Sequence, residues 1–493
     1  MIQPILIGLI IVVAIRAELP GLPLIKGVPP GAVALTALGS LAVIAVVTHV
    51  LLAALGRGLD RTGSHRLLTL ADATLDISRV AVLVAHGFAV IGVGWLDVVR
   101  AWLGGGDPAR GDWILIDEAL VLLPPTLALL AGWWSYFVID RRLREAALLS
   151  SLEFGEAVLR LPTRAQYLAD HVRHHLLLII LPVGFLTAWT EFIAWAVDYD
   201  LVGLRTRLGV EPQSWGVLGL HALGVAGLLA TMPLILRRLW RTVALGPGEL
   251  RDRLLELCAR QGVRCRDVLV WRTHHSMVNG AMVGIVPRLR YIMLTETLLE
   301  RLPIDQVEAV MAHEVAHARR HHLPWLLAVL VSSIGLCWMA FSAVIAWGVE
   351  LTGVPVDGLI GALLGVGMLV AALAAALLVF GAVSRVFERQ ADAFGAQHLS
   401  GMTRDLKATG GLPVRPDAAE AMINALGAVA RINRISPARF SWRHGSILTR
   451  QRALRATIGR PVGSLHADRV AGRIKLAALA GIAALMILTI VGA

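Results

Sequence analysis

Long apolar runs separated by shorter polar stretches set the pattern of this chain. A helix needs about 20 residues to cross the roughly 30 Å hydrocarbon core of a bilayer. Runs of at least that length lie at residues 31–56, 79–99, 113–138, 175–197, 214–236, 325–349, 357–383 and 472–492. We expect each of these runs to be a membrane-spanning helix.

A shorter apolar run covers residues 3–18 and allows two interpretations. It could be a signal peptide, but it lacks a basic start, and Arg16 stands where a small-residue cleavage site is expected. We therefore expect residues 1–18 to be retained as a first span, which brings the predicted total to about nine spans.

Composition supports a lipid-embedded protein. Of the 493 residues, 56% are hydrophobic and only 16% are charged, and the mean hydropathy is +0.69. That is far more apolar than an ordinary soluble domain.

Arginines concentrate in loops that the predicted spans place on one side of the membrane. They are Arg57, Arg61, Arg66, Arg79, Arg141, Arg142, Arg144, Arg160, Arg164 and Arg173. The opposite loops, at 100–112 and 198–213, mix arginine with acidic residues. By the positive-inside rule the arginine-rich side is cytoplasmic, and we expect a multi-pass protein of the plasma (inner) membrane. The net charge of +11 follows from this topology, so we expect no nucleic-acid partner.

The cysteines give no sign of a disulfide scaffold or of a cysteine zinc site. Cys258, Cys265 and Cys337 are odd in number, have no C-x-x-C spacing, and include one residue within a predicted span.

Three polar stretches, at about 139–174, 238–323 and 384–470, are long enough to fold outside the bilayer. In the first, apolar residues recur at helical spacing, so we expect an amphipathic connector at the membrane surface. These residues are Leu143, Ala146, Leu149, Leu152 and Phe154.

The second polar stretch mixes helical and strand-like patterns. The elements expected in order are a helix at 247–261, strands at 267–272 and 290–295, and helices at 296–301 and 303–322. Asn279-Gly280 and Val286-Pro287 punctuate the chain between the two strands. We expect a small β-sheet here.

The last of these helices carries candidate metal chemistry. Residues 312–317 read Ala-His-Glu-Val-Ala-His, which contains the H-E-x-x-H pattern of zinc metallopeptidases. Residues four apart share a helical face, so His313 and His317 can bind one Zn²⁺ while Glu314 flanks the open position. A carboxylate there can take a proton from metal-bound water, whose pKa the ion lowers. The alternative is a surface helix whose polar side chains are merely solvated.

A second element strengthens the metal hypothesis. Residues 384–392 read Ser-Arg-Val-Phe-Glu-Arg-Gln-Ala-Asp directly after a predicted span. Glu388 and Asp392 are four apart and share a face, which suits a carboxylate ligand with a second carboxylate behind it. Taken alone, such an acidic pair is often only a solvated face.

Together, residues 307–317, residues 384–392 and Asn279-Gly280-Ala281 resemble the membrane metallopeptidase family of HtpX-type heat-shock proteases and zinc CaaX prenyl proteases. The resemblance covers roughly residues 245–455 and leaves the first five or six spans unexplained. It implies one zinc ion per chain, bound by His313, His317 and Glu388, with Glu314 as the general base.

The resemblance also implies supporting roles. Asp392 matches the aspartate after the third ligand and would orient His313 or a neighbouring group. Asn279 matches an edge segment that holds the substrate backbone, although Gly280 stands where alanine is usual. Arg385 is either paired with a nearby carboxylate or a cation at the base of its helix.

A late His-Pro-x-x-x-x-Arg element of that family matches residues 444–450. It implies that His444 steadies the oxyanion and that Arg450 contacts the substrate. Gly445 replaces the proline, which weakens the match at His444.

The spans at 325–349 and 357–383 are expected to form a hairpin. Pro324 begins the first of them about 10 Å of helix beyond His317, and Glu388 comes soon after the second one ends. The metal should therefore lie at the cytoplasmic membrane surface, where membrane proteins or lipid-linked peptides are the natural substrates.

Two functions of other classes compete with a peptidase. Histidines at 171, 174, 175, 313, 317, 321 and 322 resemble the boxes of a di-iron membrane oxidase, although that reading leaves the sheet and Glu388 unexplained. A non-catalytic membrane adaptor or transporter would need few of the catalytic residues, and candidate intramembrane acids are limited to Asp117, Glu118 and Glu191.

We therefore predict a polytopic α-helical membrane protein with a cytoplasmic α+β, gluzincin-type peptidase domain split around a transmembrane hairpin. Its parts are a multi-span region at 1–237, the peptidase domain at 238–470 with the hairpin at 325–383, and a last span at 471–493. The predicted reaction is hydrolysis of internal peptide bonds in membrane-associated or misfolded proteins, with CaaX prenyl-protein processing as the alternative. The oligomeric state stays open.

Overall fold

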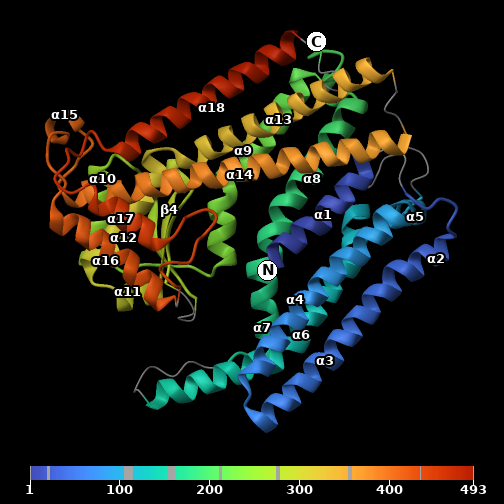
Figure 1. The fold of residues 1–493 in the computed structure, drawn as a ribbon, viewed down its shortest axis with the longest axis horizontal. Helices are drawn as coiled ribbons and strands as arrows, with labels where there is room; N and C mark the ends of the chain where they lie inside the picture. The colour runs from blue at the N-terminus through green and yellow to red at the C-terminus, as the bar shows by residue number, and fades with distance from the viewer. Residues whose placement is uncertain are drawn as a thin grey trace. The chain divides into compact units, whose positions relative to one another are not determined.

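One small sheet stands among many helices in the computed structural model of the chain (Figure 1). The structure describes residues 2–18, 23–104, 115–153, 161–209, 214–273, 278–353, 358–433 and 435–491. Internal contacts divide the chain into two units, Met1–Leu228 and Leu229–Ala493.

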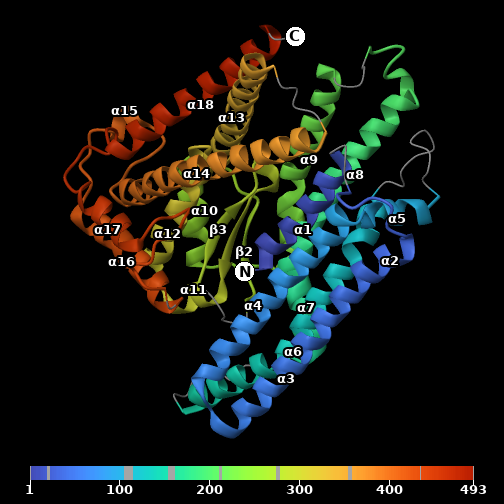
Figure 2. The same ribbon diagram turned by 45° about the vertical axis from the view of Figure 1, so that its right-hand side comes forward.

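The first unit is helical in its described residues. Its helices are α1 (Ile2–Glu18), α2 (Pro30–Ala34), α3 (Ser40–Thr62), α4 (His65–Gly87), α5 (Trp95–Trp102), α6 (Ile116–Glu153), α7 (Arg164–His171), α8 (Leu177–Asp198) and α9 (Trp215–Leu239), which crosses the boundary. Single π-helical turns follow α2, α4 and α7, at Leu35–Gly39, Phe88–Gly92 and Val172–Leu176, and a 3₁₀ turn lies at Leu201–Gly203. Helices α3, α4 and α6 run side by side in both views, and α1 packs on α4 (Figure 2).

The second unit combines the sheet with helices. Its strands are β1 (Val243–Ala244), β2 (Asp267–Trp271), β3 (Gly280–Val283) and β4 (Tyr291–Thr295). Its helices are α10 (Glu249–Arg260), α11 (Glu296–Arg301), α12 (Ile304–Arg319), α13 (His322–Thr352), α14 (Gly358–Leu399), α15 (Leu406–Thr409), α16 (Pro416–Ile432), α17 (Ile447–Arg455) and α18 (His466–Val491), with a 3₁₀ turn at Pro287–Leu289.

The sheet has the order β1-β2-β4-β3, with β2 and β4 parallel and the outer strands antiparallel to their neighbours. Strand β4 is buried throughout, because its apolar side chains face helices of the core. Strand β3 is an edge strand, and α12 packs directly beside it. A buried cluster joins the sheet to α10, α12, α14 and α16.

The predicted class, a polytopic helical membrane protein with an α+β domain, is confirmed. Among the described residues, eight helices are long and apolar enough to cross a membrane. They are Pro30–Thr62, Arg66–Gly92, Ile116–Glu145, Arg164–Asp198, Gly216–Leu239, His322–Thr352, Gly367–Leu399 and His466–Leu488. The shorter apolar helix Ile2–Arg16 corresponds to the predicted ninth.

In the first unit, two predicted boundaries differ from the structure. The span expected at 79–99 instead ends at Gly92, because Gly94 adopts a left-handed conformation (φ 84°) and starts a separate helix, α5. The connector expected at 139–174 is partly a continuation of α6, which runs on to Glu153. Its residues 154–160, including Phe154, lie outside the described residues.

In the second unit, four predicted elements match the structure. The helices expected at 247–261 and 296–301 correspond to α10 and α11, and the strands expected at 267–272 and 290–295 correspond to β2 and β4. The helix expected at 303–322 ends earlier, at Arg319, because His321 adopts a left-handed conformation (φ 54°). The division of the chain into parts at 237 and 470 stays a prediction.

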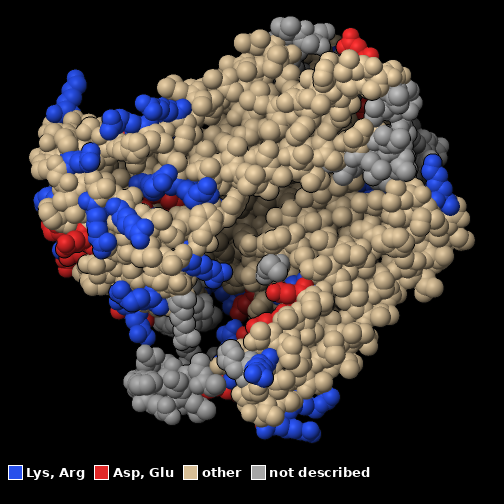
Figure 3. Space-filling model, viewed as in Figure 1, with Lys and Arg blue, Asp and Glu red and all other residues tan. Residues whose placement is uncertain are grey.

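Charged side chains are unevenly distributed on the visible face (Figure 3). In the first unit, the surface over the middle of α3 carries no charge, and basic side chains gather at the end of α3 away from α2. In the second unit, basic side chains gather around α15, α16 and α17, while the long helices α13 and α14 are largely uncharged. This separation is typical of helices that cross a bilayer between charged ends.

The close approach of α8 and α9 gives a test of this packing. The indole of Trp189 on α8 donates to the carbonyl of Leu220 on α9 at 2.9 Å, and a methyl group at Gly224 would lie 2.2 Å from the same ring. At Gly219, on the same helix, a methyl group would meet nothing within 4 Å. We expect Gly224→Ala to destabilise the protein by about 1–3 kcal/mol and Gly219→Ala to leave it unchanged or more stable.

The measurement is the apparent Tm of each variant in detergent. Because both substitutions change helix propensity equally, a similar Tm for the two variants would mean that the contact with Trp189 is not as described.

Candidate metal centre

Helix α12 carries the H-E-x-x-H motif. Its residues Val307, Met311 and Val315 recur every fourth position and are at most 1% exposed, because this face packs into the core beside α14 and α16. The adjoining face therefore has a fixed direction, and it presents His313 and His317.

Helix α14 brings the third predicted ligand to these histidines. Nε2 of His313 lies 3.2 Å from Nε2 of His317. The carboxylate oxygens of Glu388 lie 3.6 Å from the first nitrogen and 3.7 Å from the second. Among the described residues these three form the one group of His, Cys, Asp or Glu side chains close enough to share a metal ion.

The donor set fits a tetrahedral zinc ion. Ligand atoms at about 2.0–2.1 Å from zinc in a tetrahedron lie roughly 3.3 Å from one another. The three measured separations, 3.2, 3.6 and 3.7 Å, are close to that value. Two imidazoles and one carboxylate are also the donors of catalytic zinc sites that keep a fourth position open.

Electrostatics acts differently on the two histidines. Burial opposes the charged form of His313, but the Asp392 carboxylate beside it raises the pKa of His313 above its ordinary value. Burial, together with the neighbouring His313, lowers the pKa of His317 to about 3. His317 is therefore neutral, and its lone pair is available to a cation. Burial raises the pKa of the Glu314 carboxyl, which brings it nearer to the range of an efficient general base.

Asp392 and Arg450 form a charged pair behind the ligands. Oδ1 of Asp392 lies 2.9 Å from Nδ1 of His313. The guanidinium of Arg450 donates to both oxygens of Asp392, at 2.7 and 2.6 Å, and lies 3.4 Å from Glu388. Burial opposes the charge of Arg450, but Asp392 beside it raises the pKa of the guanidinium above its ordinary value.

Asp392 lies beside His313, as the sequence predicts. Arg450 was predicted to contact the substrate, but in the structure it lies behind the ligands. Arg450 is 8% exposed, and its guanidinium contacts the carboxylates of Asp392 and Glu388. It therefore faces the ligands and not an open substrate surface. Its contact with substrate stays a prediction.

Strand β3 borders the site. The backbone N–H of Met282 points to Oε2 of Glu314 at 3.4 Å, so β3 runs past the predicted general base. Asn279, just before β3, exchanges hydrogen bonds with Thr295 of β4 through its backbone. Its side chain is exposed beside the strand, which is compatible with the substrate role that the resemblance implies.

The segment with His444 is held against α14. The guanidinium of Arg385 donates to the carbonyl of Trp442 at 2.8 Å and lies 5.4 Å from the ring of Phe440. The Trp442 ring stacks on Phe380, and a side chain at Gly381 would collide with it at 2.4 Å. Within the described part of the chain, Arg385 thus fixes this loop and does not pair with a carboxylate.

This loop brings His444 to the metal ligands. Nδ1 of His444 lies 3.0 Å from Oε1 of Glu388, while 49% of its side chain is exposed. His444 therefore joins a buried ligand to the open side of the site.

The sequence analysis missed two residues of the site. Met282 was overlooked because Asn279-Gly280 was interpreted as a turn between two strands, whereas β3 begins there. His322 was assigned to the end of a continuous helix, but its Nδ1 lies 2.8 Å from Nδ1 of His317. The histidine repeated after H-E-x-x-H was the one available signal, and it was considered only for the di-iron alternative.

The structure does not support the di-iron alternative, because the described residues contain no second group of side chains close enough to hold a metal ion. His171 and His175 lie in the first unit, where they pack against the ring of Trp133 at 5.1 and 5.9 Å. Nδ1 of His171 and of His174 is engaged with a backbone carbonyl one turn earlier. These contacts suit a packed aromatic cluster.

The charged pair gives a test of how the site is built. We expect Arg450→Met to destabilise the protein by about 3–5 kcal/mol, because it leaves Asp392 and Glu388 buried without their cation. Arg452→Met, an exposed position on the same helix α17, is the matched control and should change little. Apparent Tm and bound metal of the two variants check this, and equal stability would contradict it.

Comparisons with known proteins agree with this geometry. Residues 246–458 match peptidase family M48. A protease HtpX homolog of Aeropyrum pernix is 29% identical over 213 residues, which cover 38% of this chain and 63% of that protein. A protease HtpX homolog of Persephonella marina is 28% identical over 149 residues, which cover 30% of this chain and 50% of that protein. The match thus spans less than two thirds of either relative.

The crystal structure of Ste24p from S. mikatae shares the fold with a TM-score of 0.50 at 16% identity. The likeness covers 87% of this chain and all of that one. That likeness shows a common fold, while the sequence matches agree with the resemblance stated from the motifs. Residues 246–458 are therefore similar to peptidase family M48, in a chain whose described residues include eight helices able to span a membrane.

Proposed function

We propose that this chain is a zinc-dependent endopeptidase that cleaves membrane-associated or misfolded proteins at the cytoplasmic face of the membrane. The observation that carries the proposal is the convergence of His313, His317 and Glu388 at tetrahedral spacing beside Glu314. A bound Zn²⁺ would supply a nucleophilic water near neutral pH and polarise the substrate carbonyl.

Glu314 is the residue that moves the proton. It takes the proton from the attacking water and returns it to the amine of the leaving peptide, as a general base and then a general acid. Its raised pKa suits both steps, since a strongly acidic carboxyl would be a weak base. The metal ligands His313 and His317 share its helix, so one rigid element sets the distance between proton acceptor and ion.

Strand β3 supports binding of an extended peptide. The backbone N–H of Thr295 on β4 donates to the carbonyl of Asn279. Because hydrogen-bonded and non-hydrogen-bonded pairs alternate along antiparallel strands, the backbone groups of Gly280 and Met282 point away from β4. A substrate added to this edge would lie along Glu314. His444 is half exposed and lies 3.0 Å from Glu388, and it would steady the oxyanion once its contact with Glu388 is released.

The membrane helices support the choice of substrate. Helix α13, whose apolar run starts at His322, begins five positions after His317, and Glu388 lies within the apolar helix α14. The site is therefore built at the ends of spans. The arginine-rich loops support a cytoplasmic location for this side, by the positive-inside rule.

We expect Glu314→Gln to lose at least about 10²–10⁴-fold in kcat/KM while it retains stoichiometric zinc, because the amide can accept no proton. Asp305→Asn, an exposed position of the same helix, is the control and should cleave normally. The assay is cleavage of an unfolded protein by the detergent-purified enzyme, before and after chelation and after zinc is returned.

A further arm distinguishes the CaaX alternative. A prenylated peptide and its unprenylated form are compared with the unfolded protein, and preference for the prenylated peptide alone would replace the quality-control role. Wild-type protein that binds no zinc would contradict the ligand assignment, and full activity of the Glu314 variant would contradict the mechanism.

A further inference from the structure

A buried hydrogen-bond chain starts at the metal ligand His317. Its Nε2 faces the other ligands, and its Nδ1 lies 2.8 Å from Nδ1 of His322. Nε2 of His322 lies 2.9 Å from the side-chain oxygen of Gln390, whose amide nitrogen donates to Asp468 at 2.7 Å. Asp468 stands in the first turn of α18.

One arrangement of hydrogens satisfies every bond in this chain. A metal ion on Nε2 of His317 leaves the hydrogen on Nδ1, which donates to His322. His322 then carries its hydrogen on Nε2 and donates to Gln390. The amide of Gln390 donates to Asp468, and a carboxylate is an acceptor only.

A break in the helix makes this contact possible. In a continuous helix, a residue five positions after His317 would point about 140° away from it. Instead α12 ends at Arg319, and His321 adopts a left-handed conformation (φ 54°, ψ 43°), from which α13 starts at His322. Non-glycine residues take this conformation rarely and at a cost, so the break is a feature that the surrounding structure maintains.

The side chains of the chain are held firmly. His322 is 1% exposed and Gln390 is 3% exposed. The ring of His322 stacks on Phe387 at 4.4 Å, with 8° between the planes. Asp468 is also paired with Arg320 at 3.1 Å.

We propose that His322, Gln390 and Asp468 form a positioning relay that fixes the orientation and hydrogen placement of the ligand His317, and that couples it to the start of the span α18. The inference rests on the proposed zinc function. Partners of this kind behind a histidine ligand raise its basicity, and their loss typically costs about 10–100-fold in metal affinity.

The experiment measures zinc affinity of detergent-purified full-length variants by competition with a chelator, together with the absorption spectrum of the cobalt-substituted protein. His322→Leu should bind zinc about 10–100-fold more weakly and alter the cobalt spectrum. His322→Gln, which can still accept from His317, should recover part of the affinity. The control is His321→Asn at the exposed position next to His322. Asparagine tolerates the left-handed conformation of residue 321, so the zinc affinity of this variant should be unchanged.

Asp468→Asn tests the end of the relay that lies farthest from the metal. This variant should also lose zinc affinity, but by a smaller factor than His322→Leu. Equal zinc affinity and an unchanged cobalt spectrum in His322→Leu would overturn the relay while leaving the proposed function intact. Wild-type protein without zinc would remove both. A fall in the Tm of metal-free His322→Gln with no change in affinity would show a merely structural role.

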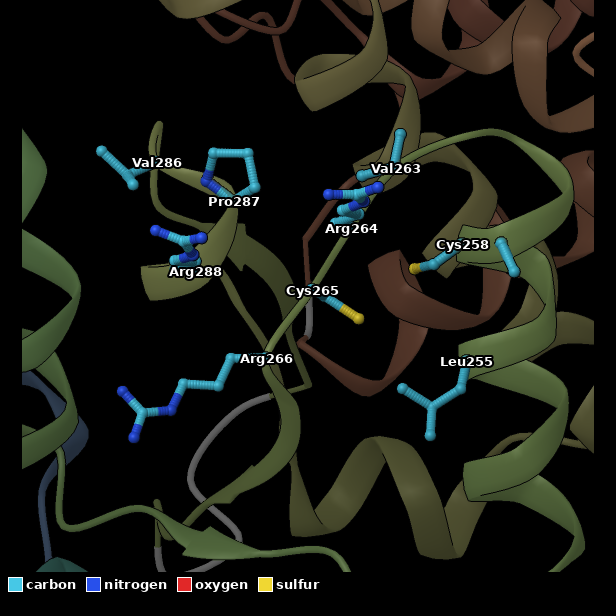
Figure 4. Close-up of a pocket in the computed structure, with 10 residues that line it drawn as sticks. Leu255, Cys258, Val263, Arg264, Cys265, Arg266, Val286, Pro287 and Arg288 are labelled. Carbon is cyan, nitrogen blue, oxygen red and sulfur yellow. The ribbon is translucent and has the colours of Figure 1, made fainter.

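A second inference comes from a cavity of about 720 Å³ in the same unit, whose lining includes none of the predicted site residues (Figure 4). Its ten lining residues include Arg264, Arg266 and Arg288 and no acidic residue. In Figure 4, Arg266 and Arg288 lie on the opposite side of Cys265 from Leu255 and Cys258, so the cavity has a cationic wall and an apolar wall.

The cationic wall is a built feature. The guanidinium of Arg290 donates to the carbonyls of Gly284, Ile285 and Arg264, at 2.9, 2.7 and 3.3 Å, and so ties the loop after β3 to the segment before β2. Arg264, Arg266 and Arg288 have no carboxylate partner within the described ranges. Three such cations around one hollow repel each other unless an anion binds.

Contacts place this wall beside the end of a span. A side chain at Gly284 would lie 3.0 Å from Pro233 of α9, so the loop packs on the last turns of that helix. Arg237 of α9 and Arg266 both lie over the ring of Tyr291, at 5.6 and 5.9 Å. The cavity therefore lies near the end of the candidate span Gly216–Leu239, and lipid headgroups are expected at the ends of spans.

We infer that this cavity binds the headgroup of an anionic phospholipid, with the phosphate among the arginines and the glycerol region against Leu255 on the apolar wall. Each basic side chain near the membrane surface increases the affinity for anionic lipid by about fivefold.

The test titrates the full-length protein with phosphatidylglycerol and, separately, phosphatidylcholine, followed by native mass spectrometry. Replacing Arg264, Arg266 and Arg288 by Gln should weaken phosphatidylglycerol binding by about fivefold per arginine, with no effect on phosphatidylcholine. The control replaces three exposed arginines elsewhere, Arg452, Arg455 and Arg460, which changes the net charge equally. Equal weakening in the two variants, or inorganic phosphate binding to the arginines without any lipid preference, would overturn the inference.

Discussion

The bidentate ion pair between Asp392 and Arg450 is the interaction on which the candidate metal centre depends. Asp392 and Glu388 leave the same face of α14 one turn apart, so two carboxylates enter a buried region together. Without a cation they would repel each other or take up protons, and Glu388 would be a poorer ligand. Arg450 offsets the repulsion between the two carboxylates, and it does so from the side away from the open position. Asp392 therefore stays charged and lies against Nδ1 of His313.

The buried carboxylates must also be held at a fixed distance from the histidines. This requirement explains why the domain is split around a pair of long helices. Helix α14 is both a predicted span and the carrier of Glu388 and Asp392, since it runs without a break from Gly358 to Leu399. Helix α13 packs along it and joins it to α12. The separation between the histidines and the glutamate is therefore set by packing between helices, which is stiffer than a loop connection.

Sequence patterns predicted the parts of the site that local spacing determines. His313, His317 and Glu314 follow from one helix, and the pairing of Glu388 with Asp392 follows from the four-residue spacing of another. Spans were found because length and apolarity suffice to identify them. The spacing could not reveal β3, whose four residues begin at a dipeptide typical of turns, or the pairing of Arg450 with Asp392 across 58 positions. It also could not reveal the left-handed turn at His321, because nothing in a histidine predicts that conformation.

The two histidine ligands are backed differently, and the charge balance of the centre gives a reason. Two neutral imidazoles and one carboxylate leave a divalent ion with a net charge of about +1, which is what polarises a substrate carbonyl. A carboxylate directly behind a histidine donates electron density to the metal through the ring. His313 has such a partner in Asp392, whose charge Arg450 largely offsets. A second carboxylate directly behind His317 would further weaken the ion as a Lewis acid, whereas His322 and Gln390 hold the ring in place through neutral groups and keep Asp468 two side chains away.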